Sequence, residues 1–123
     1  MSSSAKVLIV DDEDLMVRVL TRMLEQGGHE VLSAPSAELG LQLAARESFA
    51  VVLLDNHLGA GMVGTRALVD FCRLCSAGVI MMTGYTTEGL EEDAKLLGAK
   101  AFLRKPIDPG VLLAAVDSLL PAT

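Results

Sequence analysis

The amino-acid sequence predicts an α/β domain in which five parallel strands form a doubly wound sheet with helices on both faces. Short apolar, β-branched segments alternate with longer segments whose apolar residues recur at helical spacing, and this alternation occurs five times along 123 residues. Short right-handed crossovers then give a parallel sheet, for which we expect the strand order 2-1-3-4-5. This length suits a single domain, residues 1–123, with residues 1–5 as a flexible N-terminus.

The expected strands are short, and most of them are continuously apolar. Uninterrupted apolar strands are typical of parallel sheets whose two faces are both covered by helices. One segment, 30–33, instead alternates in polarity and therefore suits an edge of the sheet. The expected strands span residues 7–10, 30–33, 51–54, 79–82 and 101–103.

The expected helices differ in the strength of their signals. The first has the clearest pattern, because apolar residues from Leu15 to Leu24 recur at helical spacing before Gly27 and Gly28 provide a stop. The last begins at Asp108, an N-capping residue that precedes proline at the first helical position. Three weaker helices are expected at about 36–47, 65–75 and 87–97.

Composition excludes several classes of function. The formal net charge is −6, which argues against direct binding to nucleic acid because phosphates require a basic surface. No apolar run is long enough to span a bilayer, and no basic N-terminal segment precedes a cleavage site. We therefore expect a cytoplasmic protein without membrane contact, whose partners are proteins or small ligands.

Residues 59–64, GAGMVG, match the G-x-G-x-x-G fingerprint of dinucleotide-binding domains. In such domains the first glycine follows its strand directly, and an acidic residue closes the next strand. Here residues 55–58 intervene, and the next expected strand ends in Thr83. A glycine-rich turn into the third helix is therefore the favoured interpretation, and we expect no nucleotide cofactor.

Acidic residues follow the first and third expected strands. Asp11 and Asp12 follow the first strand and Asp55 follows the third, and these strands are neighbours at the topological switch point. Three convergent carboxylates repel one another and must either hold protons or bind a cation, and clustered oxygen ligands suit Mg²⁺. Helix capping explains Glu13 and Asp14, which precede the first helix, but it does not explain Asp55.

A hydroxyl and an ammonium group follow the remaining two strands. Thr83 ends the fourth strand and Lys105 follows the fifth. Because the carboxyl ends of parallel strands meet at one edge of the sheet, both side chains should converge on the carboxylates. The set then contains metal ligands, a carboxylate nucleophile, a hydroxyl donor and a cation, which are the groups that phosphoryl transfer to aspartate requires.

Across nearly its whole length the sequence resembles the response regulator receiver domain of two-component signalling, which has a flavodoxin-like (βα)5 fold. The resemblance implies a phosphoacceptor switch rather than a conventional turnover enzyme. It also implies a histidine kinase or phosphotransfer protein as the donor, and an output protein or domain that the sequence does not identify. The matching segments are VLIVDDE at 7–13, VVLLD at 51–55, MMTGY at 81–85 and GAKAFLRKPID at 98–108.

The resemblance further implies roles for the residues around the expected metal. Asp11 and Asp12 help to bind Mg²⁺, and Asp55 contacts the metal and accepts the phosphoryl group. The main-chain carbonyl of His57 completes the metal shell. For the His57 side chain, exposure to solvent and a position bordering the phosphate remain equally open.

The other implied roles concern the strands at the far side of the site. Thr83 and Lys105 contact the phosphoryl group, and Phe102 changes rotamer on activation. This movement alters the surface formed by the fourth helix, the fifth strand and the fifth helix. The resemblance also implies a cis peptide bond between Lys105 and Pro106.

The sequence departs from the receiver pattern in the loop after the phosphoacceptor. Gly59 stands where receivers usually have proline, and the glycine that follows, Gly64, comes one residue late. We therefore expect a loop that is longer and more mobile than usual. Two alternatives to the switch remain, a receiver-like binding module that works without phosphorylation and a flavodoxin-like enzyme that shares only the topology.

The cysteines and the remaining histidine have plainer interpretations. Cys72 and Cys75 form a C-x-x-C segment, but they lie late in the third expected helix rather than at its start, where reactive thiols occur. They share a helical stripe with Leu68 and Phe71, so packing against the sheet is favoured over redox chemistry. His29, in a Gly-Gly-His turn, is expected to be a solvated loop residue.

Overall fold

The computed structural model describes residues 4–57, 64–84 and 88–120. Five strands and five helices alternate along this part of the chain. The strands form one parallel sheet in the order β2-β1-β3-β4-β5, which confirms the predicted topology. The strands are β1 (Lys6–Val10), β2 (Glu30–Ala34), β3 (Val51–Asp55), β4 (Gly78–Thr83) and β5 (Ala101–Arg104).

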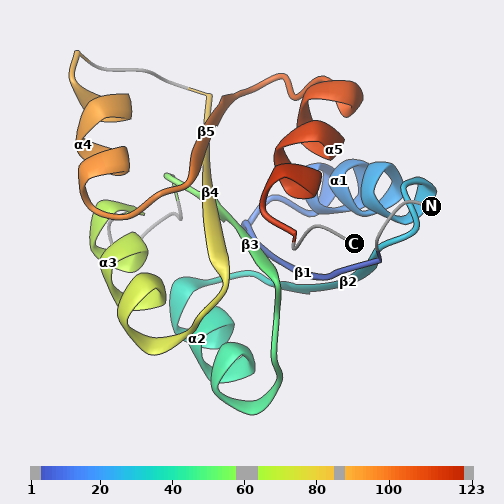
Figure 1. Ribbon diagram of the computed structural model, residues 1–123, viewed down its shortest axis with the longest axis horizontal. Helices are drawn as coiled ribbons and strands as arrows, with labels where there is room; N and C mark the ends of the chain where they lie inside the picture. Colours follow the sequence, from blue (N-terminus) through green and yellow to red (C-terminus); the bar gives the residue numbers. More distant parts are fainter. Residues whose placement is uncertain (1–3, 58–63, 85–87, 121–123) are drawn as a thin grey trace.

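Helices cover both faces of this sheet. Figure 1 shows α1 and α5 together on one side, and α2, α3 and α4 on the other. None of the helices in the described part of the chain is both long and apolar enough to cross a lipid bilayer. The helices are α1 (Asp14–Gln26), α2 (Ala37–Arg46), α3 (Gly64–Leu74), α4 (Leu90–Leu96) and α5 (Pro109–Ser118).

The core consists of two apolar clusters, one on each face of the sheet. In β1, Val7 and Ile9 face the cluster under α1 and α5, whereas Leu8 and Val10 face the cluster under α2, α3 and α4. All four side chains are fully buried. The continuous apolar strands of the sequence are therefore explained by a sheet that is covered twice.

The start of α5 agrees with the capping residues in the sequence, whereas the start of α4 does not. The Asp108 carboxylate accepts a hydrogen bond from the N–H of Val111 at 3.0 Å, and Pro109 opens α5. α4 begins later than expected, at Leu90, after Gly89 in a left-handed conformation with φ 83°. Only glycine adopts this conformation without cost, so Gly89 sets the start of the helix.

At the edge of the sheet where the strands begin, the expectation for His29 is wrong. His29 is buried rather than solvated, with 5% of its surface exposed. Ala5, expected within a flexible N-terminus, is buried as well, and its N–H donates a hydrogen bond to Nδ1 of His29 at 3.1 Å. The reason is tertiary, because α5 packs directly over this turn: a Cβ on Gly27 would lie 2.6 Å from Leu113. Residues 1–3 lie outside the described part of the chain.

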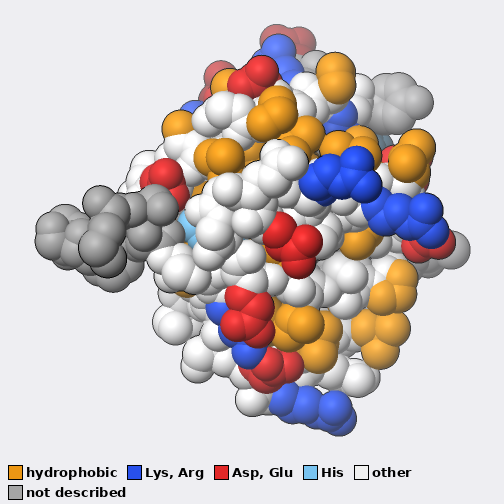
Figure 2. All heavy atoms as spheres, turned by 90° about the vertical axis from the view of Figure 1, so that its right-hand side faces the viewer, with side chains coloured by type: hydrophobic (Ala, Val, Ile, Leu, Met, Phe, Trp, Pro, Cys, Tyr) orange, Lys and Arg blue, Asp and Glu red, His pale blue; other side chains and the backbone are white. Residues whose placement is uncertain are grey.

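The face of the domain that includes α1 and α5 carries acidic, basic and apolar side chains next to one another (Figure 2). The basic side chains visible there stand among acidic and apolar ones.

Candidate phosphorylation site

Strand register places the two buried acidic residues side by side. Val10 of β1 and Leu54 of β3 are directly paired in the sheet. Asp11 and Asp55 are the next residues along these neighbouring strands, at the edge where the strands end. The N–H of Asp11 donates to the carbonyl of Ala34, which fixes the end of β1 against β2.

The structure brings the three predicted acidic residues together. Asp11, Asp12 and Asp55 each offer a carboxylate oxygen, and these oxygens all lie within 4.8 Å of one another. Asp11 and Asp55 are buried, whereas Asp12 is exposed. Three clustered oxygen donors with one open side fit a hard divalent cation that keeps some of its water ligands.

Lys105 reaches the same point from the end of β5. Its ammonium nitrogen Nζ lies 3.2 Å from Oδ2 of Asp11 and 3.4 Å from Oδ1 of Asp55. The Lys105 N–H donates to the carbonyl of Thr83 at 2.8 Å, and the Lys105–Pro106 peptide bond is cis, as expected. The ammonium group of Lys105 thus contacts both buried carboxylates.

Main-chain N–H groups orient both buried carboxylates. The N–H of His57 donates to Oδ1 of Asp55 at 3.3 Å, and the N–H of Glu13 donates to Oδ1 of Asp11 at 3.0 Å. Each donor lies two residues after its acceptor, as in an Asx-turn. The loops after β1 and β3 therefore fix the direction of the carboxylates.

A pocket of about 540 Å³ opens in front of these groups. Four of its lining residues are among the expected site residues, and two, Glu13 and Gly84, are not. Glu13 occupies the N-cap position of α1 without a side-chain hydrogen bond to the helix. The pocket is lined by Asp12, Glu13, Asp55, His57, Gly84 and Lys105.

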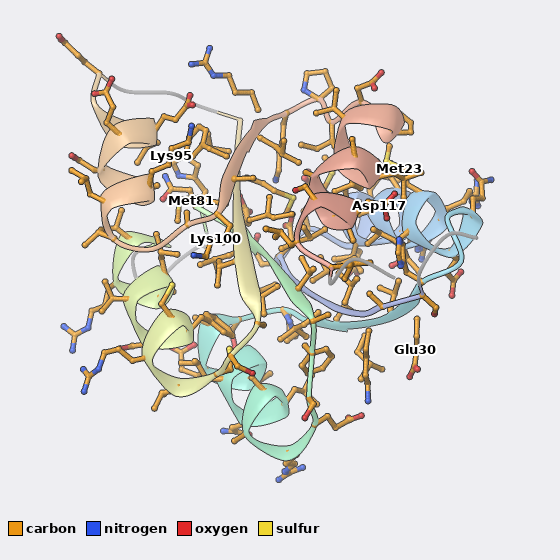
Figure 3. All side chains as sticks on the ribbon, in the orientation of Figure 1. Met23, Glu30, Met81, Lys95, Lys100 and Asp117 are labelled. Carbon is orange, nitrogen blue, oxygen red and sulfur yellow. The ribbon has the colours of Figure 1, made fainter. Side chains whose placement is uncertain are left out.

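Thr83 ends β4 and has no exposed surface, and Gly84, the next residue, lines the pocket. Side chains alternate between the faces of a strand, so Thr83 shares a face with Met81, whose side chain belongs to the cluster under α2, α3 and α4. Phe102 is half-buried against the same cluster, and Figure 3 shows Met81 on this side of β4.

The electrostatics of the site oppose a negative charge on Asp55. Burial raises the pKa of Asp55, and the neighbouring Asp11 carboxylate raises it further. Lys105 and the N–H of His57 only partly offset these effects. Burial alone would lower the pKa of Lys105, but the charges of Asp55 and Asp11 outweigh it, so this pKa is raised. The arrangement favours an additional cation.

This charge distribution predicts a stabilising substitution in the absence of divalent metal. A carboxyl group whose pKa is raised by folding holds its proton more tightly in the folded state than in the unfolded state. The free energy of unfolding therefore falls as the pH rises from the unfolded-state pKa through the folded-state pKa. We expect Asp55→Asn to raise the free energy of unfolding at neutral pH by on the order of 1 kcal/mol. The gain should shrink as the pH is lowered and as Mg²⁺ is added, which urea unfolding in chelator and in Mg²⁺ would measure. An equal gain under all conditions would contradict this account.

The C-x-x-C segment of α3 packs against the core rather than lining the pocket. Cys72 and Cys75 are half-buried against the core, and the Cys75 thiol donates to the carbonyl of Phe71 at 3.0 Å. Burial raises the pKa of Cys72, which lowers its reactivity. These contacts favour packing, as expected. Residues 59–63 of the glycine-rich segment lie outside the described residues, and Gly64 is the first residue of α3.

Comparison with known proteins agrees with this geometry. Residues 7–117 match the response regulator receiver domain family. Protein PilH from Pseudomonas aeruginosa is 36% identical over 118 residues, which cover 94% of this chain and 98% of PilH. The chain spans only 23% of the response regulator protein FleR from the same organism, to which it is 35% identical.

Solved structures show the same relationship. A CheY-like response regulator receiver domain protein from Methanospirillum hungatei has a TM-score of 0.86 and 32% identity, with coverage of 95% of this chain and 97% of that one. A second structure is a response regulator from Burkholderia pseudomallei with a phosphorylated aspartic acid, calcium ion and citrate. Its TM-score is 0.83 at 31% identity, and the match covers 90% of this chain and 65% of the regulator. The chain belongs to the response regulator receiver domain family.

Proposed function

We propose that the domain is a phosphoacceptor switch that receives a phosphoryl group on Asp55 in a Mg²⁺-dependent reaction. The donor is a histidine kinase or a phosphotransfer protein, the location is the cytoplasm, and the domain is not a conventional turnover enzyme. The observation that carries this proposal is the position of Lys105, whose Nζ contacts both Asp11 and Asp55 beside an open pocket. A phosphodonor can therefore reach a buried carboxylate whose surroundings already hold a cation for the phosphoryl oxygens.

Asp11, Asp12, Asp55 and the carbonyl of His57 would hold the metal. When bound, Mg²⁺ offsets the repulsion between these carboxylates and the incoming phosphoryl oxygens. Oxygen ligands that lie within 4.8 Å of one another suit this ion, and the regulator from Burkholderia pseudomallei, which contains a calcium ion together with a phosphorylated aspartic acid, supports a divalent cation.

The chain's own groups perform the remaining steps. Oδ1 of Asp55 is held by the N–H of His57 and faces Lys105, so we assign the attack on phosphorus to Oδ2. The new Oδ2–P bond forms as the P–N bond of a phosphohistidine donor, or the P–O bond of acetyl phosphate, breaks. Lys105 then pairs with the transferred phosphoryl oxygens, because its compact ammonium group lies within reach of the acceptor.

Intact-protein mass spectrometry after incubation with acetyl phosphate tests this proposal. We expect the mass of one labile phosphoryl group to be added in Mg²⁺. A binding module that works without phosphorylation would gain no mass, and a flavodoxin-like enzyme would likewise leave its own chain unmodified. Either result would refute the proposed switch.

Removal of the divalent cation is expected to stop the reaction. Without metal, the carboxylates of Asp11, Asp12 and Asp55 repel the phosphoryl oxygens, and Lys105 provides only one compensating charge. We expect a fall of at least about a hundredfold in the initial labelling rate when EDTA replaces Mg²⁺, and recovery when Mg²⁺ is returned in excess. Labelling at an unchanged rate in EDTA would exclude the metal from the mechanism.

A further inference from the structure

The buried imidazole of His29 connects three separate segments of the chain. It lies in the turn between α1 and β2, and its side chain is 1% exposed. Nδ1 accepts the N–H of Ala5 at 3.1 Å, at the start of β1. Nε2 lies 3.7 Å from Oδ1 of Asp117, near the C-terminal end of α5. We call these three residues the His29 cluster, and it lies at the opposite edge of the sheet from Asp55.

The surrounding backbone keeps the ring in this position. The N–H of His29 donates to the carbonyl of Leu24, and the N–H of Glu30 donates to the carbonyl of Ala5. Leu113 of α5 packs over Gly27, one helical turn before Asp117. α5 therefore contacts the turn through one apolar and one acidic side chain on the same helix face, and Figure 3 shows Asp117 between α5 and α1.

The hydrogen bond to Ala5 determines where the imidazole carries its proton. A nitrogen that accepts a hydrogen bond has no proton of its own, so the neutral ring must carry its proton on Nε2. That proton is directed toward Asp117, at a distance too long for a strong hydrogen bond. In the neutral state the ring is thus bound mainly to the start of β1.

Addition of a second proton reverses these preferences. Protonated Nδ1 becomes a donor that faces the donor N–H of Ala5, so this hydrogen bond is lost. The charged ring at the same time gains an attraction to the Asp117 carboxylate. Of the charged residues next to this turn, Lys6 of β1 is paired with Glu47, and the Glu30 side chain is exposed.

We propose that His29 is a proton-controlled switch that holds the start of β1 when neutral and holds α5 when charged. In mild acid the hydrogen bond from the Ala5 N–H to His29 is lost, which releases the N-terminal segment at Ala5. The contact between His29 and Asp117 of α5 becomes stronger at the same time. None of the residues of the His29 cluster lines the pocket at Asp55.

Hydrogen exchange at the Ala5 amide tests this proposal in the intact protein. His29→Asn serves as the matched variant, because its side-chain oxygen can replace Nδ1 as an acceptor but cannot take up a proton in this range. At about pH 8 we expect the Ala5 amide to exchange at similar rates in both proteins. At about pH 5 the parent should exchange roughly five- to tenfold faster than His29→Asn, the loss expected for one hydrogen bond. An equal ratio at both pH values would overturn the proposal.

Imidazole NMR spectra of the parent protein give a second measurement that does not depend on the variant. The chain has two histidines, so few imidazole signals have to be assigned. We expect the neutral His29 ring to carry its proton on Nε2, because Nδ1 accepts the N–H of Ala5. A neutral ring protonated on Nδ1 would refute the switch.

Discussion

Replacement of Asp55 with asparagine is expected to abolish phosphorylation while the fold persists. The amide has nearly the same shape as the carboxyl group, but it lacks the anionic oxygen that attacks phosphorus. Asp55 is 3% exposed, and its Oδ1 lies 3.4 Å from Nζ of Lys105. The exposed carboxylates in the described part of the chain do not share this environment, so we do not expect them to replace Asp55. We expect labelling by acetyl phosphate in Mg²⁺ to fall by at least about a thousandfold.

The control for this variant is an aspartate close to the site but outside the pocket. Asp14 is exposed in the first turn of α1 and is not among the lining residues. Asp14→Asn should be labelled at nearly the parental rate, and its circular dichroism should match that of Asp55→Asn. Full labelling of Asp55→Asn on another residue would show that the nucleophile has been assigned wrongly.

Replacement of Thr83 with alanine is expected to uncouple phosphorylation from the distal surface. Thr83 is fully buried at the end of β4, directly before Gly84, and it shares a face of the sheet with half-buried Phe102. A phosphoryl group on Asp55 would present new acceptor oxygens, to which the Thr83 hydroxyl can donate after a small movement. Phe102 would then fill the space that the hydroxyl leaves, and this would alter the surface of α4, β5 and α5.

The energy required for such a switch is modest. Phosphorylation need not create the active arrangement, because it can shift an equilibrium that already exists. A shift from 1:99 to 99:1 requires about 5.5 kcal/mol of differential stabilisation. Together, several charge-assisted hydrogen bonds and a metal contact can supply a free energy of this magnitude. Among these interactions, the hydrogen bond from the Thr83 hydroxyl is the one that would link the site to β5.

NMR chemical shifts with and without beryllofluoride test the coupling. In the parent protein we expect changes near Asp55 and also in α4 and β5, whereas in Thr83→Ala the distal changes should be lost and those near Asp55 should remain. Thr83→Ser keeps the hydroxyl and should retain the distal changes. Identical distal changes in the alanine variant and the parent would show that Thr83 does not transmit the signal.

The sequence by itself determined the architecture and the composition of the site. Apolar strands and amphipathic helices are patterns of neighbouring residues, so segments such as 7–10 and 51–54 specify a doubly covered parallel sheet without knowledge of their partners. The order β2-β1-β3-β4-β5 then brings Asp11 and Asp55 to one edge. These inferences succeeded because strand direction and register are repeated along the whole sheet.

Only the tertiary structure decided which polar groups are buried and what each one contacts. His29 is buried because α5, more than eighty residues along the chain, covers its turn, and a Gly-Gly-His segment contains no sign of that distant helix. Lys105 contacts two buried carboxylates, and Thr83 has no exposed surface. Burial and hydrogen-bond partners depend on which remote segments meet, whereas periodicity reports only which face of an element turns inward.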